Sequence, residues 1–404
     1  MSISGRHFLQ IPGPTNVPDR ILRAMDRPVV DHRGPEFAEL TKEILPLLKE
    51  VFGTHEGTVV IYPSSGTGAW EAALVNVLSP GERILAFNYG HFSELFARTA
   101  RNLGYDVEEV PLRWGQELPA EEVEAHLRAD DGENPYAAVL VVHNETSTGV
   151  TSDVGAIRDA IDAAGHDALL IVDTVSSLAS IEVKHDEWRA DVTLTGSQKG
   201  LMLPPGLALL CVSPRALERG TEGGAPRNFF DWRPIIRDNE AGFFPYTPAT
   251  LLLFGLREAL KMLVEEEGLS NVYARHRSLA EGVRAAVEAW GLRNLCEKPE
   301  FYSNTLTAVV VPEGADSDEV IRVARERFGL ALGVGLSRIK GRVFRIGHLG
   351  ALNELEVLGT LGGVEMALIE SGVPVELGSG VRAAQQLFTR KPTEVAGDQD
   401  RAAV

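Results

Sequence analysis

The sequence predicts an α/β protein with a large, mostly parallel β-sheet, followed by a smaller α+β domain. Short apolar runs alternate with helix-like segments through the first two thirds of the chain. Runs without polar alternation are typical of strands that are covered on both faces. Near residue 250 the pattern changes to longer amphipathic helices with fewer apolar runs. The 404-residue length is sufficient for two domains.

The expected strands of the large sheet are short, and each is bounded by polar or turn residues. They cover residues 59–62, 84–87, 138–142, 168–172, 192–195 and 207–212. Helical patterns at 69–78 and 156–164 lie between them. In such sheets ligands bind at the carboxyl ends of the strands. The residues that directly follow a strand are therefore the first candidates for function.

The second domain is expected to contain long helices and a few strands. Helical patterns cover residues 250–267, 276–290 and 354–371, and strand patterns cover 305–311 and 342–346. We therefore divide the chain into an N-terminal arm (1–20), a large domain (21–265), a small domain (266–385) and a polar tail (386–404). We expect the tail to be partly disordered, because it is polar and contains Pro and Gly.

Composition argues against several classes of function. Acidic residues outnumber basic ones by 57 to 39, a net charge of −18, so neither nucleic acid nor an anionic membrane is an expected partner. No run reaches the roughly 18 apolar residues of a membrane span. Residues 1–10 lack the apolar core of a signal peptide, and a cytoplasmic protein is expected. Cys211 and Cys296 are too few for a disulfide framework or a four-thiolate site, and we expect no metal ion.

Three polar signals follow three of the predicted strands. Residues 64–68 (Ser-Ser-Gly-Thr-Gly) could bind phosphate at a helix N-terminus, although a capped tight turn has the same pattern. Asp173 follows an apolar strand, where a carboxylate costs desolvation unless a cation or donors meet it; a helix cap is the alternative. Lys199 lies in a Gly/Ser turn, where lysines are usually solvated, but the Pro-Pro-Gly at 204–206 makes this loop tight.

Together the three signals fit one cofactor, pyridoxal 5′-phosphate. Its aldehyde needs a lysine whose pKa is lowered by burial or nearby cations, and its pyridine nitrogen needs an anion that keeps it protonated. Its phosphate needs the backbone cup. NAD is the main rival, but Glu71 occupies the position of the third glycine of a dinucleotide motif, and the next strand ends at Asn88 and not at an acid. The sequence therefore disfavours NAD.

Six motifs resemble those of class V aminotransferases, and among these the serine–glyoxylate and alanine–glyoxylate enzymes. They lie at residues 11–15, 64–68, 143–149, 172–177, 196–200 and 345–350. The segments 31–37 and 244–248 resemble the bacterial serine–glyoxylate branch. The resemblance extends from about residue 8 to about residue 385. It implies the fold type I of pyridoxal-phosphate-dependent transferases, with a seven-stranded sheet in the large domain.

The resemblance also implies a role for each matching residue. Lys199 would bind the cofactor covalently and move a proton, Asp173 would pair with the pyridinium nitrogen, and Arg345 would hold the substrate carboxylate. Further cofactor contacts are implied for Ser65, Gly66, Thr67, Tyr89, Thr146, Thr148, Gln198, Tyr246 and Thr247. Substrate contacts are implied for Thr15, His32 and His348, although each histidine has an equally good structural explanation.

Two of these implied contacts carry further expectations. Tyr89 is the nearby aromatic residue where relatives stack a ring on the cofactor, with His91 as the alternative. Tyr246 and Thr247 would reach the phosphate of the neighbouring subunit, which implies a homodimer with shared sites or a larger assembly.

The expected reaction moves the amino group of L-serine to glyoxylate and gives hydroxypyruvate and glycine. The cofactor would carry the amino group as pyridoxamine phosphate, so ping-pong kinetics are expected. Alanine and aspartate are alternative donors, and aspartate would need a second cation such as His32, Arg33 or an arginine of the partner subunit. A cysteine desulfurase is disfavoured because Cys211 lies within an apolar strand and Cys296 in the small domain. A non-catalytic protein would have no need of the lysine, aspartate and arginine together.

Overall fold

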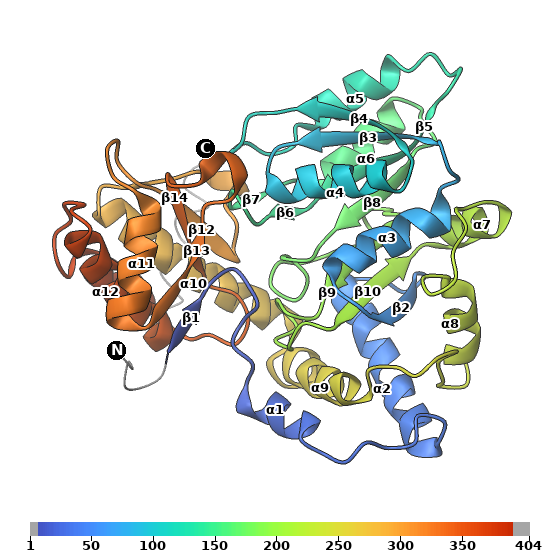
Figure 1. Cartoon of the computed structure of the whole chain (residues 1–404), viewed down its shortest axis with the longest axis horizontal. Helices are drawn as coiled ribbons and strands as arrows, with labels where there is room; N and C mark the ends of the chain where they lie inside the picture. Colours follow the sequence, from blue (N-terminus) through green and yellow to red (C-terminus); the bar gives the residue numbers. More distant parts are fainter. Residues whose placement is uncertain (1–6, 391–404) are drawn as a thin grey trace.

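The chain folds around two β-sheets, each with its own helices (Figure 1). The computed structural model describes residues 7–390. One hydrophobic core surrounds the large sheet, and a second lies between the small sheet and the last helices. Within residues 7–390, no helix combines the length and the apolar character that a bilayer crossing needs.

The large sheet has seven strands in the order β2-β10-β9-β8-β5-β3-β4. Its strands are β2 (Thr58–Pro63), β3 (Arg83–Asn88), β4 (Asp106–Pro111), β5 (Tyr136–Val142), β8 (Leu169–Asp173), β9 (Val192–Gly196) and β10 (Leu207–Val212). Only β10 runs antiparallel to its neighbours in this sheet. Every residue of β8, β9 and β10 is buried, which requires cover on both faces. The predicted α/β class and mostly parallel sheet are confirmed.

Helices that precede, separate and follow these strands in the chain accompany the large sheet. They are α1 (Asp19–Met25), α2 (Pro35–Phe52), α3 (Gly66–Val77), α4 (His91–Asn102), α5 (Ala120–Arg128), α6 (Val154–Ala163), α7 (Pro214–Glu222), α8 (Trp232–Asn239) and α9 (Thr250–Leu260). A short ribbon of β6 (Asn144–Glu145) and β7 (Val150–Thr151) follows β5. Strand β4 was not expected, because as an edge strand it is only half-buried and contains acidic residues.

The small sheet has the order β1-β13-β14-β12-β11. Its strands are β1 (Phe8–Gln10), β11 (Arg293–Asn294), β12 (Leu306–Val310), β13 (Leu330–Val334) and β14 (Val343–Gly347). Its helices are α10 (Leu269–Ala289), α11 (Ser317–Phe328), α12 (Glu354–Glu370) and α13 (Ser379–Phe388), with single 3-10 turns at Pro299–Phe301 and Ser337–Ile339. The expected N-terminal arm contributes β1, which pairs in parallel with β13.

Three predicted boundaries differ in the structure. The expected helix 250–267 ends as an α-helix at Leu260 and continues as a π-helical segment, Lys261–Glu267. Gly268, with a φ of 80°, separates it from α10, which begins seven residues before the predicted start at 276. The expected tail at 386–404 begins inside α13, and its residues 391–404 lie outside the described part.

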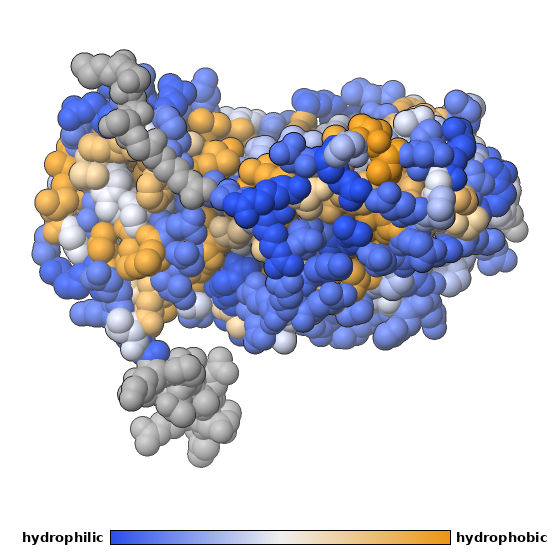
Figure 2. Space-filling view, turned by 90° about the horizontal axis from the view of Figure 1, so that it is seen from below, coloured by the Kyte–Doolittle hydropathy of each residue, from blue (hydrophilic) through white to orange (hydrophobic). Residues whose placement is uncertain are grey.

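Figure 2 shows a face on which hydrophilic residues predominate, in keeping with the 24% of charged residues.

Candidate active site

A cavity of about 290 Å³ lies at the carboxyl ends of the parallel strands. Residues that directly follow β2, β5, β8 and β9 line it, together with Gly13 and Pro14 of the N-terminal segment. The sequence-predicted residues among them are Ser65, Gly66, Thr67, Thr146, Asp173, Gln198 and Lys199. The structure therefore brings together the three polar signals of the sequence in one cavity.

The N-terminus of α3 forms one wall of this cavity. Ser65 caps the helix, and its side chain accepts a hydrogen bond from the amide of Gly68 at 3.4 Å. The first amides of a helix have no partner within it and carry a partial positive charge, which favours an anion. A Cβ at Gly196 would lie 3.2 Å from the amide nitrogen of Gly66 and 2.7 Å from the Oε1 of Gln198. Glycine at position 196 therefore leaves room beside the cup.

Asp173, at the end of β8, is a carboxylate without a cationic partner. Its Oδ1 accepts from the amide of Val175 at 2.7 Å, and its Oδ2 accepts from the Nε1 of Trp70 at 2.8 Å. Burial raises the pKa of Asp173 to about 6, against the lowering effect of these hydrogen bonds and of Lys199. Within residues 7–390 it forms no ion pair with Lys or Arg. A buried acid of this kind fits a cationic ligand group.

Lys199, in the turn after β9, is 8% exposed. Burial and the positive charge of Arg345 together lower the pKa of its amine to about 7, against the raising effect of the Asp173 carboxylate. The Nζ donates to the carbonyl oxygen of Pro12. Gly13 has a φ of +97°, and a Cβ there would lie 2.8 Å from this Nζ. Only glycine at position 13 leaves space for the lysine, whose amine is partly neutral near pH 7.

Arg345, in β14, borders the cavity without lining it. Its Nε donates to the carbonyl of Val334 at 2.9 Å, and its Nη1 donates to the carbonyl of Thr146 at 2.8 Å. Burial lowers the pKa of the guanidinium to about 10. Among the described residues it makes no ion pair with a carboxylate. The guanidinium is thus a fixed cation beside the cavity, as a carboxylate-binding residue must be.

Tyr89 does not line the cavity, contrary to the expectation. Its side chain is fully buried, and its hydroxyl donates to the carbonyl of Val142 at 2.8 Å and accepts from the amide of Val142 at 2.7 Å. The aromatic residue at the cavity in this segment is Phe92, in the first turn of α4. His91, the alternative, is not among the lining residues either. The turn at Gly90 directs these three side chains differently, which the sequence does not reveal.

Three further expected residues have contacts that hold the surrounding structure. His348 is fully buried, and its ring nitrogens contact the Oγ1 of Thr307 at 3.0 Å and the carbonyl of Asn304 at 3.2 Å. Thr148 is also buried and lies beside a separate, smaller cavity. The Oγ1 of Thr15 donates to the carbonyl of Lys199 at 3.1 Å. The histidine therefore has the structural explanation that the sequence left open.

Tyr246, Thr247 and His32 lie away from the cavity of their own chain. Tyr246 stacks on Phe229 with ring centroids 5.0 Å apart, and its hydroxyl is buried without a hydrogen-bond partner among the described residues. Thr247 is exposed. His32 is half-buried, and its Nε2 also has no partner within the described part of the chain.

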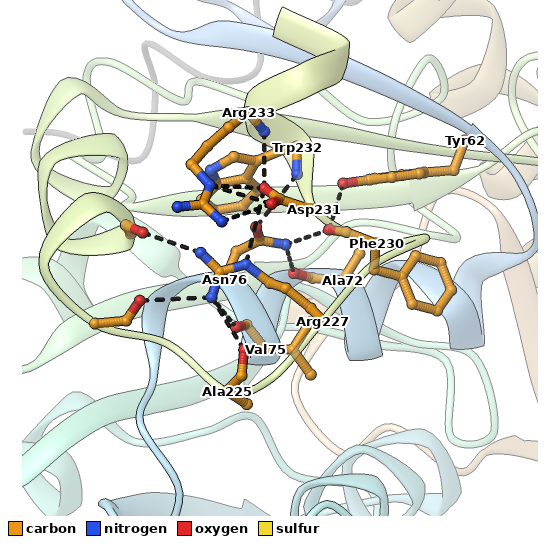
Figure 3. A network of polar contacts seen from close by, with 12 residues as sticks. Tyr62, Ala72, Val75, Asn76, Ala225, Arg227, Phe230, Asp231, Trp232 and Arg233 are labelled. Atoms are coloured by element: carbon orange, nitrogen blue, oxygen red, sulfur yellow. Dashed lines mark hydrogen bonds and ion pairs between the residues drawn. The ribbon is translucent and has the colours of Figure 1, made fainter. Parts of the chain in front are cut away.

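A network of polar contacts fixes the loop of residues 225–231, which precedes α8, against α3 (Figure 3). Arg227 donates to the carbonyls of Val75 at 3.1 Å and Ala225 at 3.1 Å, and its charge favours the C-terminal end of α3. The Nδ2 of Asn76 and the hydroxyl of Tyr62 both donate to the carbonyl of Phe230, at 2.6 and 2.8 Å. The loop and the phosphate-cup helix therefore form one connected unit.

Trp70 and Phe92 are among the cavity-lining residues that sequence reasoning missed. Both lie on helices rather than directly after strands, so the strand-end rule did not select them. One signal was available: Trp70 lies four residues after Gly66, which places both on the same face of α3.

The chain matches the family model "Aminotransferase class-V" over residues 7–341. It is 51% identical to a serine–glyoxylate aminotransferase of Methylorubrum extorquens, over 96% of this chain and 97% of that protein. It is 45% identical to an L-aspartate–glyoxylate aminotransferase of Paracoccus denitrificans, over 96% and 97% of the two chains. A ureidoglycine–glyoxylate aminotransferase of Bacillus subtilis has a similar crystal structure, with a TM-score of 0.88, 29% identity, and coverage of 96% of this chain and 100% of that one.

Proposed function

The chain belongs to the class V aminotransferase family, and from this membership we propose that it transfers the amino group of L-serine to glyoxylate, giving hydroxypyruvate and glycine. The observation that carries the proposal is the arrangement of Lys199, Asp173 and Arg345 around one cavity. Lys199 has an amine of lowered pKa, Asp173 is a buried acid without a cationic partner among the described residues, and Arg345 is a guanidinium held by two backbone carbonyls. The serine–glyoxylate and aspartate–glyoxylate relatives support the glyoxylate acceptor.

Pyridoxal 5′-phosphate is the cofactor of this enzyme, and the residues present fit it. When bound, it supplies an electron sink and a carrier for the amino group. Ser65, Gly66, Thr67 and Gln198 would hold its phosphate, and the buried Oε1 of Gln198 has no partner within the described residues. Asp173 would meet its nitrogen, and Phe92 is an aromatic side chain that lines the cavity and is available to contact its ring.

The side chains of this protein then divide the remaining work. Lys199, whose pKa is lowered to about 7 by burial, holds or releases a proton at its Nζ near neutral pH. Arg345 binds the carboxylate that the amino acid and the oxo acid share. Two parallel hydrogen bonds from the guanidinium fix the rotation of the substrate, and thereby which bond at Cα breaks.

The donor is proposed from the charges near the cavity. Aspartate would bring a second carboxylate and would need a second cation. Among the described residues that line the cavity, Lys199 is the one cationic side chain, and Arg345 adds the carboxylate-binding one at its border. Serine needs only these charges together with polar atoms for its hydroxyl. An arginine from a neighbouring subunit would change this balance in favour of aspartate.

We also propose a homodimer in which Tyr246 and Thr247 complete the site of the neighbouring subunit. The hydroxyl of Tyr246 has no hydrogen-bond partner among the described residues, and Phe229, on which its ring stacks, is exposed; both features support a subunit contact here.

The proposed compartment is the cytoplasm, because Cys211 and Cys296 are both free thiols in the fold.

A donor screen tests the proposal. The cofactor-loaded protein is given glyoxylate with serine, alanine or aspartate in turn, and the loss of glyoxylate is followed. We expect the highest kcat/KM with serine, with hydroxypyruvate formed in equal amount to glycine. The Lys199→Ala variant, folded but inactive, is the control. A higher kcat/KM with aspartate or alanine would contradict the donor, and no consumption of glyoxylate with any of them would contradict the proposal.

A further inference from the structure

We propose that Trp70 is a positioning residue for Asp173, and that its indole N–H holds the carboxylate in the orientation and charge state in which it meets the cofactor nitrogen. This inference rests on the proposed cofactor role of Asp173. The strand-end signals assign no role to Trp70, which lies in the second turn of α3.

The contact between Trp70 and Asp173 is rigid. Trp70 is 4% exposed, and its Nε1 donates to the Oδ2 of Asp173 at 2.8 Å. The indole stacks on Phe96 of α4, with ring centroids 5.2 Å apart and an angle of 15° between the planes. A side chain held on one face by a ring and at its edge by a carboxylate has little freedom to rotate. The N–H therefore has a fixed direction.

The two carboxylate oxygens of Asp173 have separate hydrogen-bond donors. The amide of Val175 binds Oδ1 at 2.7 Å, and Trp70 binds Oδ2. Two donors on different oxygens fix the plane of the carboxylate, which one donor would leave free to turn. Each carboxylate oxygen can accept more than one hydrogen bond, so both remain able to meet a cationic N–H.

The hydrogen bond from Trp70 also favours the charged form of Asp173. Burial favours the neutral form of Asp173, and the buried carboxylate of Glu145 also raises the pKa. The Val175 amide, the Trp70 indole and the charge of Lys199 act in the opposite direction. Without the indole donor, a larger fraction of the acid would be protonated near neutral pH. The anion offered to the cofactor nitrogen would then be weaker.

Trp70 and the phosphate cup lie on the same helix, α3. The N-terminus of α3 forms the phosphate cup, and Trp70 follows Gly66 by four residues on the same helix. Helix α3 thus provides the N-terminus that would bind the phosphate of the cofactor. It also carries Trp70, which contacts Asp173, the residue expected to meet the nitrogen at the other end of the cofactor. A shift of the helix would move both, which makes the bond to Trp70 a link between the two halves of the cofactor site.

The test compares two tryptophan-to-phenylalanine variants. Trp70→Phe keeps a ring against Phe96 and removes the N–H. Trp290→Phe is the matched control, because Trp290 is also 4% exposed and its Nε1 donates to the Oε1 of Glu365 at 3.0 Å in the small domain. The measurements are the Kd of pyridoxal phosphate for the apoprotein, the pH dependence of the visible absorption of the bound cofactor, and the melting temperature of the apoprotein.

We expect Trp70→Phe to raise the Kd about tenfold or more, since a hydrogen bond to a charged group is lost. In the same variant, the pH dependence of the visible absorption of the bound cofactor should also shift. Trp290→Phe should lower the melting temperature about as much as Trp70→Phe does. Its Kd and its absorption titration should equal those of the wild type. In an Asp173→Asn background, Trp70→Phe should raise the Kd less than it does in the wild type.

Two outcomes would overturn the inference. The first is a wild-type Kd and titration in Trp70→Phe. The second is an equal increase of the Kd in the wild-type and Asp173→Asn backgrounds, which would mean that the indole acts by packing alone. Borohydride trapping on the wild type separates this failure from that of the proposed function. An adduct at Lys199 would leave the proposed function intact, and its absence would overturn both.

Discussion

Replacement of Arg345 by glutamine tests how the enzyme recognises its substrates. The arginine is 6% exposed, is held by the carbonyls of Val334 and Thr146, and has no carboxylate partner among the described residues. Its charge is therefore available to an incoming anion. Serine and glyoxylate share a carboxylate, so the Arg345→Gln change should impair both.

The expected loss follows from the hydrogen bonds. Bonds to charged groups contribute about 1.5–3 kcal/mol each, and two parallel bonds at the lower value give about 3 kcal/mol. Because about 1.4 kcal/mol corresponds to a factor of ten, kcat/KM should fall about 100-fold for each substrate. Steady-state kinetics with serine and glyoxylate varied separately measure both values, and the change in each converts to a loss of transition-state stabilisation.

Arg284→Gln is the matched control for this experiment. Arg284 is a half-buried arginine of α10 whose Nη1 donates to the carbonyl of Ser303 at 3.0 Å. Its loss should lower stability and leave both kcat/KM values within about twofold, since no substrate carboxylate reaches it. Unchanged kcat/KM values for both substrates in Arg345→Gln, or an equally large fall in Arg284→Gln, would refute this role of Arg345.

Three further predictions concern the amine, a buried acid and the proposed subunit contact. The rate at which the apoprotein binds pyridoxal phosphate covalently should rise with pH and level off above about 7. Burial lowers the pKa of Lys199, and only the neutral amine reacts. A midpoint of this rate–pH curve near the ordinary lysine pKa of about 10.4 would contradict the prediction. Glu145→Gln should lower the melting temperature by several degrees, because the carboxylate accepts from the amides of Phe92 and Ser147 and an amide group would face these donors; an unchanged melting temperature would count against it. Tyr246→Phe should raise the cofactor Kd without changing the stability of the isolated chain, because the hydroxyl has no partner among the described residues; an equal Kd would remove Tyr246 from the shared site.

The strands of the large sheet could be predicted from the sequence where burial on both faces excludes polar residues. This holds for β8, β9 and β10, which are apolar almost throughout. It fails for β4, whose outer position at the edge admits acidic residues. It also fails for β1, a three-residue strand whose partner β13 lies some 320 residues along the chain, since pairing at that distance leaves no local pattern.

The site could be predicted as far as its residues follow strand ends. Asp173 and Lys199 do, and the parallel sheet brings them to one edge. Trp70 and Phe92 reach the cavity from helices, where the direction of a side chain depends on packing and not on the local sequence. Tyr89 is absent from the cavity lining for the same reason, because a turn decides which neighbouring ring enters the cavity.

The central claim is that Lys199 is the residue that carries the cofactor. Borohydride reduction of the pyridoxal-phosphate-loaded protein, followed by proteolysis and mass mapping, tests it most directly. The buried amine, with its lowered pKa and its place beside Asp173, predicts one pyridoxyl group on the peptide that contains Lys199. A pyridoxyl group on another lysine, or on none, would contradict the account.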